Sequence, residues 1–236
     1  MPSRTTPSRP NSTPSTPGKT KKAKGPARPK APVAPTAAGP EHDLVDDAVH
    51  RDLAFGALDL GGRDAQDVDI ERCVFDGTRL PGTLLERATI SDAVFDRCDL
   101  ANLRFTNSRA FAVAVSGSRM TGAAFTDCAL QDIVVEGCRA DLAGFRFSAF
   151  KRAVFRDCNL EGATFQNADL RGVRFEGCRL RGAQFSGATM AGARFSGCDL
   201  WGVAGVQSMA GVTVAAEDAP GLLAGFAAEL GITIEG

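Results

Sequence analysis

The sequence predicts an all-β solenoid, a rod of short stacked coils, and three observations lead to this class. Every position divisible by five from Phe55 to Leu200 is apolar, and twelve of these 30 positions are Phe. The residue two places earlier is mostly small, while the residue two places later is most often Gly, Asp or Asn. A helix repeats about every 3.6 residues and a strand about every two, so a period of five fits neither.

Each five-residue unit combines a very short extended stretch with a tight turn. Two side chains spaced by two residues point the same way from an extended backbone, so the small residue and the apolar residue share one side. Gly, Asn and Asp tolerate the unusual backbone angles of a turn. Extended stretches that always bend in one direction close into a coil, and coils must stack because one coil cannot bury its own apolar side chains.

Four units carry a resemblance to the pentapeptide-repeat family, whose consensus is close to Ala-(Asp/Asn)-Leu-x-x: Cys98-Asp99-Leu100, Cys158-Asn159-Leu160, Ala168-Asp169-Leu170 and Cys198-Asp199-Leu200. The resemblance covers residues 53–204. It implies a right-handed quadrilateral parallel β-helix with four of the five-residue units in each coil. The repeat is then long enough for about 7–8 coils.

Residues four units apart, at i and i+20, should stack, and the sequence supports this spacing. Phe follows Phe and Leu follows Leu along two columns, so we expect ladders of like side chains inside the rod. The packing should be weakest where Val115, Val135, Ala110 and Ala140 reduce the side-chain volume. The predicted core ladder consists of Phe75, Phe95, Phe155, Phe175, Phe195, Leu80, Leu100, Leu160, Leu180 and Leu200.

All seven cysteines occupy the small-residue position of the unit, and no Cys-x-x-Cys pair occurs. We therefore interpret them as small buried hydrophobic residues in a reducing compartment, in preference to a redox or metal-binding ladder. Inward-facing thiols without charged neighbours should have raised pKa values and low reactivity. Five share one predicted buried column: Cys98, Cys138, Cys158, Cys178 and Cys198.

The segments outside the repeat differ in composition. Residues 1–40 contain ten of the twelve prolines and eight basic residues with no acid, so we expect a disordered basic tail. Such a tail is a tether or a weak polyanion-binding arm. Residues 41–52 are expected to form an N-terminal cap, and residues 205–236 a C-terminal cap.

A helix is predicted over about 220–230, since Pro suits its first turn and Gly suits its exit. Its apolar stripe either covers the last coil or, as the family resemblance implies, forms a homodimer contact. The candidate cap or dimer residues are Leu222, Leu223, Phe226 and Leu230.

The formal net charge of −1 hides an uneven distribution. Residues 41–100 carry 15 acidic and six basic residues, net −9, whereas residues 101–204 carry nine acidic and 13 basic residues, net +4. We expect the early coils to present a candidate acidic interaction face made by Asp59, Asp64, Asp67, Asp69, Glu71, Asp76, Asp92, Asp96 and Asp99.

Two functions follow as hypotheses. One is a non-catalytic scaffold for an unknown protein partner. The other comes from the family resemblance: a DNA-mimicking binder of DNA gyrase or topoisomerase IV that protects it from quinolones or peptide toxins. The acidic early coils favour the mimic, but the basic later coils do not, because DNA is negative along its whole length.

Enzymatic activity is not expected. Both histidines, His42 and His50, precede the repeats, and no phosphate-binding loop of the Gly-x-x-x-x-Gly-Lys type occurs. No cofactor or metal is expected. The chain lacks an apolar run of ~18 residues and a secretory signal, so we expect no membrane span and a cytoplasmic location.

Overall fold

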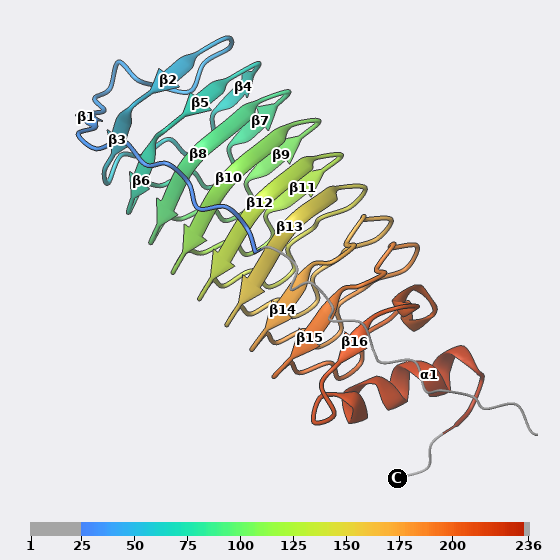
Figure 1. Ribbon diagram of the computed structural model, residues 1–236. Helices are drawn as coiled ribbons and strands as arrows, with labels where there is room; N and C mark the ends of the chain where they lie inside the picture. The colour runs from blue at the N-terminus through green and yellow to red at the C-terminus, as the bar shows by residue number, and fades with distance from the viewer. Residues whose placement is uncertain (1–24, 234–236) are drawn as a thin grey trace, which may run out of the picture.

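The computed structural model describes residues 25–233, which form a parallel β-helix of about nine turns (Figure 1). Most strands are two or three residues long, and four are eight residues long. The strands are β1 Thr36–Ala37, β2 Val49–Arg51, β3 Leu53–Phe55, β4 Asp64–Gln66, β5 Asp69–Glu71, β6 Val74–Asp76, β7 Leu84–Glu86, β8 Thr89–Asp96, β9 Arg104–Thr106, β10 Arg109–Ser116, β11 Ala124–Thr126, β12 Ala129–Glu136, β13 Ala149–Arg156, β14 Arg174–Glu176, β15 Arg194–Ser196 and β16 Thr213–Val214.

Each full coil consists of four five-residue units, as the sequence predicts. In the pairing of β10 with β12, Val113 lies opposite Ile133 and Val115 opposite Val135. The same offset joins β12 to β13 and β13 to β14. One twelve-stranded sheet and one four-stranded sheet result, and isolated parallel bridges such as Asp99 to Arg119 continue the ladder between them.

The corners of the coil lie at the position two residues after each ladder residue. Glycines there have positive φ, and so do short polar residues such as Asp67 (φ 57°) and Asn102 (φ 54°). The turn role expected for Gly, Asp and Asn is thereby confirmed. Leu142 (φ 58°) and Phe147 (φ 59°) adopt the same conformation without the advantage of a small or hydrogen-bonding side chain, and both are exposed.

Like side chains stack along the inside of the rod. The rings of Phe55, Phe75 and Phe95 lie nearly parallel, with centroids 4.5 and 4.4 Å apart. Phe175 lies 5.2 Å from Phe155 and 4.8 Å from Phe195 in the same column. Rings of neighbouring columns meet edge to face, so aromatic contacts extend across the rod as well as along it.

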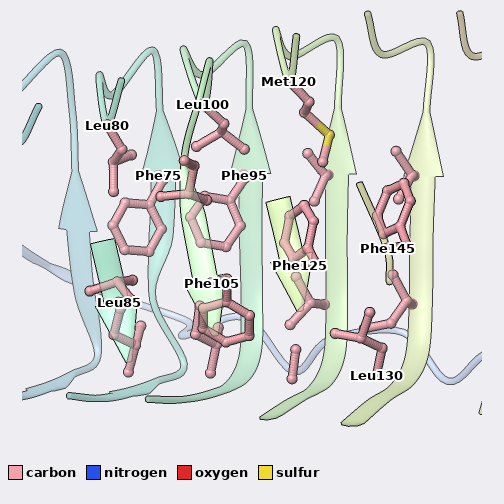
Figure 2. A pocket seen from close by; sticks show the side chains of 18 of the residues that line it. Phe75, Leu80, Leu85, Phe95, Leu100, Phe105, Met120, Phe125, Leu130 and Phe145 are labelled. Atoms are coloured by element: carbon pink, nitrogen blue, oxygen red, sulfur yellow. The ribbon is translucent and has the colours of Figure 1, made fainter. Parts of the chain in front are cut away.

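The middle coils are the least completely filled. An entirely apolar cavity of about 70 Å³ lies inside the rod, and its lining includes Ala110, Val115 and Val135. Figure 2 shows the larger side chains around it, with Phe75 and Phe95 in neighbouring coils and Met120 and Leu130 further along. The reduced volume of these columns explains why the cavity lies here.

Both ends extend the rod beyond the repeat, so the sequence-based count of 7–8 coils is slightly low. At the N-terminal end, β2 pairs with β5, and Leu44 is buried in the core. At the C-terminal end, β16 pairs with β15, and Arg194 lies opposite Thr213, one position short of the regular offset. The rod therefore continues past the expected boundary at residue 204.

The C-terminal cap contains two 3-10 helices, η1 Val206–Met209 and η2 Ala219–Leu222, followed by the helix α1 Leu223–Glu229. The helix predicted over 220–230 is thus split into a 3-10 turn and a shorter α-helix. Leu222 and Ala227 are buried, so η2 and α1 cover the last coil only with part of their apolar surface. Figure 1 shows α1 lying across the end of the rod.

Residues 25–38 form an extended N-terminal arm that lies along the side of the rod. From β1, which pairs with β3, the arm crosses in front of β8 and β10 toward the C-terminal end (Figure 1). The described part of segment 1–40 is therefore docked on the rod, which differs from the tail that its composition predicts. Residues 1–24 of the expected tail lie outside the described residues.

Candidate functional site

The cysteines lie inside the rod, where the sequence places them. All seven are buried and have free thiols. In the column from Cys138 to Cys198, each thiol donates a hydrogen bond to a carbonyl of the preceding coil; Cys158 Sγ, for example, lies 3.4 Å from Val135 O. Their polar hydrogens are thus satisfied by the backbone, and the column serves packing.

Burial makes these thiols poor nucleophiles. It raises the pKa of Cys98 and of Cys128 to about 11, and it raises the pKa of Cys73 as well. Hydrogen bonding with the neighbouring thiols of Cys158 and Cys198, followed by burial, raises the pKa of Cys178, and the same hydrogen bonding lowers the pKa of Cys158 and of Cys198. The thiolate is the reactive form of cysteine, so Cys73, Cys98, Cys128 and Cys178 supply little of the reactive species at neutral pH, and burial limits access to all seven thiols.

Asp218 terminates this column and was not identified from the sequence. Its buried carboxylate accepts a hydrogen bond from the Cys198 N–H at 2.9 Å. Ser118 plays the same role earlier in the column, where its hydroxyl accepts from the Cys98 N–H at 2.9 Å. Asp218 lies one full coil after Cys198, so the repeat spacing could have revealed it as a member of the column.

The nine candidate acidic residues do not form one face. They occupy several columns around the rod, and most are paired with an arginine one coil away or close by. Arg87 contacts Asp67 at 2.7 Å, and Arg51 contacts Glu71 at 3.0 Å. The other ion pairs join Asp59 to Arg79, Asp69 to Arg51, Asp76 and Asp96 to Arg97, and Asp99 to Arg119. Asp92 accepts a hydrogen bond from the N-terminal arm, and Asp64 is exposed on β4.

Two arginine pairs in the early coils hold the pKa of a carboxyl group below its usual range. Hydrogen bonds from Arg72 lower the pKa of Asp52, and hydrogen bonds from Arg87 lower the pKa of Asp67. The later coils contain equivalent pairs, such as Arg156 with Glu176 at 3.0 Å and Arg171 with Asp169. Arginine pairs therefore occur in both halves of the rod, and in the early coils they offset part of the negative charge, which still sums to −9 over residues 41–100.

Asp132 is the most deeply buried acidic side chain in the described part of the chain. The Arg152 guanidinium binds both of its oxygens, and the Ala27 N–H donates to it at 3.0 Å. Arg152 is the main cause that lowers the pKa of Asp132 to about 2. This carboxylate is consequently ionised at every physiological pH and held in one orientation.

The candidate cap helix buries only part of its predicted stripe. Leu222 packs against the core, whereas Leu223, Phe226 and Leu230 are exposed. Trp201, on the final coil, is also exposed, and a side chain at Gly221 would meet its backbone. Several large apolar side chains therefore lie on the C-terminal end of the rod.

The two histidines belong to the N-terminal cap. His50 is buried edge-on against Phe55 at 5.6 Å, and burial lowers its pKa. The His42 Nδ1 accepts a hydrogen bond from the Gly39 N–H at 3.1 Å. Within residues 25–233, no group of three or more His, Cys, Asp or Glu side chains is arranged to hold a metal ion. None of the helices in that range is long and apolar enough to cross a bilayer.

Together these features define a repeat solenoid whose interior is filled with packed side chains. Two family models match the chain: one described as pentapeptide repeat region over residues 136–204, and one described as pentapeptide repeats (8 copies) over residues 69–107. The chain belongs to the pentapeptide-repeat family.

Two of the solved structures that resemble the chain come from repeat proteins with different roles. A trypsin-treated variant of QnrB1, a plasmid-mediated fluoroquinolone resistance protein, is 21% identical, with 80% of this chain and 100% of that chain covered and a TM-score of 0.45. HetL, a pentapeptide repeat protein involved in heterocyst differentiation regulation from the cyanobacterium Nostoc sp. strain PCC 7120, is 18% identical, with 67% and 89% covered and a TM-score of 0.34. A comparison with curated proteins found no match.

Proposed function

We propose that this protein is a non-catalytic scaffold that binds a protein partner through the outside of its rod. The observation that carries the proposal is the apolar stripe at the C-terminal end, made by Leu223, Phe226 and Leu230. Apolar side chains that gather on a surface are typical of interaction sites. The interior is filled with packed side chains, so the outer surface is the part of the molecule that a partner would meet.

One partner that suits this stripe is a second copy of the chain, joined end to end through α1. A two-fold interface is self-complementary, and an exposed apolar helix can pack against its own copy. The test is the mass of the full chain in solution by light scattering over micromolar concentrations. We expect a dimer, and a monomer when Leu223, Phe226 and Leu230 are all replaced by Ser.

Leu142→Ser provides the matched control, because Leu142 is also an exposed leucine but lies on a corner of an earlier coil. This variant should remain dimeric. If the chain is monomeric throughout, affinity capture with the tagged full chain is the second test. A protein that is captured by the unmodified chain and by Leu142→Ser, but not by the triple variant, would support a heterologous partner. If the triple variant captures the same proteins as the unmodified chain, the stripe is not a binding site.

The second candidate is a DNA-mimicking binder of DNA gyrase or topoisomerase IV. It is supported by the rod shape and by the net charge of −9 over residues 41–100. The arginine pairs along the rod weaken it, because they neutralise some of the carboxylates that would imitate phosphates. A gyrase supercoiling assay with and without a quinolone tests it: absence of both inhibition and protection at micromolar protein would exclude this role.

A further inference from the structure

The N-terminal arm has a regular sequence that matches the regular surface below it. Proline occurs at every third position from Pro26 to Pro35, namely 26, 29, 32 and 35. A polyproline II helix also has three residues per turn, so these prolines lie on one side of an extended chain. Between residues 25 and 35, the half-buried residues are Pro26, Pro29 and Pro32, and all others are exposed. The proline side of the arm therefore faces the rod.

Two hydrogen bonds to side chains of the rod fix residues 25–35 of the arm, and both use the residue that follows a proline. The Ala27 N–H donates to Asp132 Oδ1 at 3.0 Å, and the Lys30 N–H donates to Asp92 Oδ1 at 2.9 Å. Asp92 and Asp132 occupy the same corner column, two coils apart, on β8 and β12. Both hydrogen bonds are donated by backbone N–H groups whose positions follow from the proline spacing. They do not depend on the side chains of Ala27 or Lys30.

The distance between successive prolines of the arm matches the distance between every second coil of the rod. Three residues of polyproline II span about 9.3 Å. Two steps between neighbouring strands span about 9.5 Å. A proline-x-x repeat can therefore place one backbone N–H over every second coil without stretching or slipping, and the arm does so at Asp132 and Asp92.

The surface under the arm is shielded from solvent although it faces outward. Ala112 and Asp132 are each 1% exposed and Val154 is 2% exposed, yet none of them belongs to the inner core cluster. Ala112 is the small residue between Asp92 and Asp132 in the corner column. Arg152 also holds the Asp132 carboxylate. The result is a track with two carboxylate acceptors placed two coils apart and a small residue between them.

We propose that this track on β8, β10, β12 and β13 is a recognition site for polyproline II segments with proline at every third residue. In the resting chain it is occupied by residues 25–35, and it becomes open to a proline-rich segment of a partner protein when the arm leaves. The seated arm shows the chemistry of the occupant: Pro-x-x repeats, with a backbone N–H available after the proline, as after Pro26 and Pro29. The site lies on the side of the rod, so the inference is independent of the C-terminal stripe.

The arm is suited to exchange. Much of it is exposed, and the side-chain hydrogen bonds that hold residues 25–35 are the two to Asp132 and Asp92. Segments with few buried contacts open at low free-energy cost compared with the core. A polyproline II peptide is already extended before binding, so it loses little conformational freedom when it docks.

The test uses the full chain and a labelled peptide with the sequence of residues 25–37. In a variant with Pro26, Pro29 and Pro32 all replaced by Ala, the N-terminal arm of the chain itself should leave the track. Fluorescence anisotropy should then show the peptide binding at least tenfold more tightly to this variant than to the unmodified chain. A peptide of the same composition with the proline spacing scrambled should not bind.

A further substitution locates the site. Adding Asp92→Ala to the proline variant removes one acceptor and should weaken peptide binding roughly tenfold. Asp64→Ala, an exposed carboxylate on a different strand column, is the matched control and should leave binding unchanged. Circular dichroism and thermal unfolding check that each variant keeps the fold. Faster trypsin cleavage after Lys30 in the proline variant independently reports that the arm has left.

The outcomes separate the alternatives. Binding that requires the proline spacing and Asp92 supports the proposal. Absence of peptide binding to a folded variant with a released arm overturns it, as does equal binding to the unmodified chain, which would mean that the arm does not occupy the site. If the unmodified chain is a dimer and the proline variant is a monomer, the occupant of the track is the arm of a second copy. That result would overturn the proposal that the occupant comes from a partner protein.

Discussion

The cavity in the middle coils makes a quantitative prediction about stability. Val115 borders the apolar cavity of about 70 Å³, so Val115→Ile can place its extra methylene group there. Val173→Ile adds the same group to a fully buried site that does not border the cavity. The two substitutions add the same group at buried sites, one inside β10 beside the cavity and one immediately before β14 and away from it.

The expected gain at Val115 has two contributions. Burying one more methylene contributes about 0.8 kcal/mol. Filling ~25 Å³ of cavity at ~24 cal/mol per Å³ adds about 0.6 kcal/mol. The sum corresponds to a rise in Tm of roughly 3–6 °C for a chain of this length. At Val173, overpacking should instead cost about 1–3 kcal/mol.

Differential scanning calorimetry of the two variants and the unmodified chain measures both effects. The reasoning requires the difference between the variants, because each alone could reflect a general effect of replacing a buried Val by Ile. If Val115→Ile lowers Tm as much as Val173→Ile does, the cavity does not accept a methylene group and the interior is packed more uniformly than the lining residues indicate.

Three further predictions concern the core, the thiols and the outer ion pairs. Phe175→Ala should lower the free energy of unfolding by about 3–5 kcal/mol in denaturant titrations, whereas the exposed Phe111→Ala should change it by less than about 0.5 kcal/mol. All seven cysteines should label slowly in the native chain and completely in denaturant; rapid native labelling of Cys98 or Cys128 would contradict their burial and their pKa of about 11. The pKa of Asp132 falls from 3.8 to about 2 on folding, so its stabilising effect is present above pH 3.8 and is lost as pH falls to about 2. Asp132→Asn should remove this part of the dependence of Tm on pH, and a curve identical to that of the unmodified chain would contradict the role of the Arg152 pair.

The sequence predicts the rod well because each position of the repeat has one environment in every coil. Phe175 stacks between Phe155 and Phe195 because residues one coil apart occupy equivalent places. The same arithmetic could have located the ion pairs, since Asp52 with Arg72 and Asp67 with Arg87 are also each one coil apart. Composition alone suggested an acidic interaction face on the early coils, since it counts charges without pairing them.

The segments outside the repeat were harder to predict. The arm has a composition typical of disorder, and its hydrogen bond from Ala27 to Asp132 joins residues 105 positions apart. A contact that uses backbone N–H groups and proline spacing leaves no hydrophobic pattern to detect. In the C-terminal cap, the 3-10 turn before α1 reorients the predicted stripe, so that Leu222 is buried and Leu223 is exposed.

Because each coil has four corners, the number of five-residue units between two surfaces of the rod determines the angle between the directions in which they face. Removing or adding a whole coil would change its length by about 4.8 Å and keep every column aligned. Removing or adding one five-residue unit would rotate everything beyond it by a quarter turn about the axis. The number of units between Asp92 and α1 therefore sets the direction in which the C-terminal end faces relative to the docked arm, and a change of a single unit could redirect one surface without altering the packing of either.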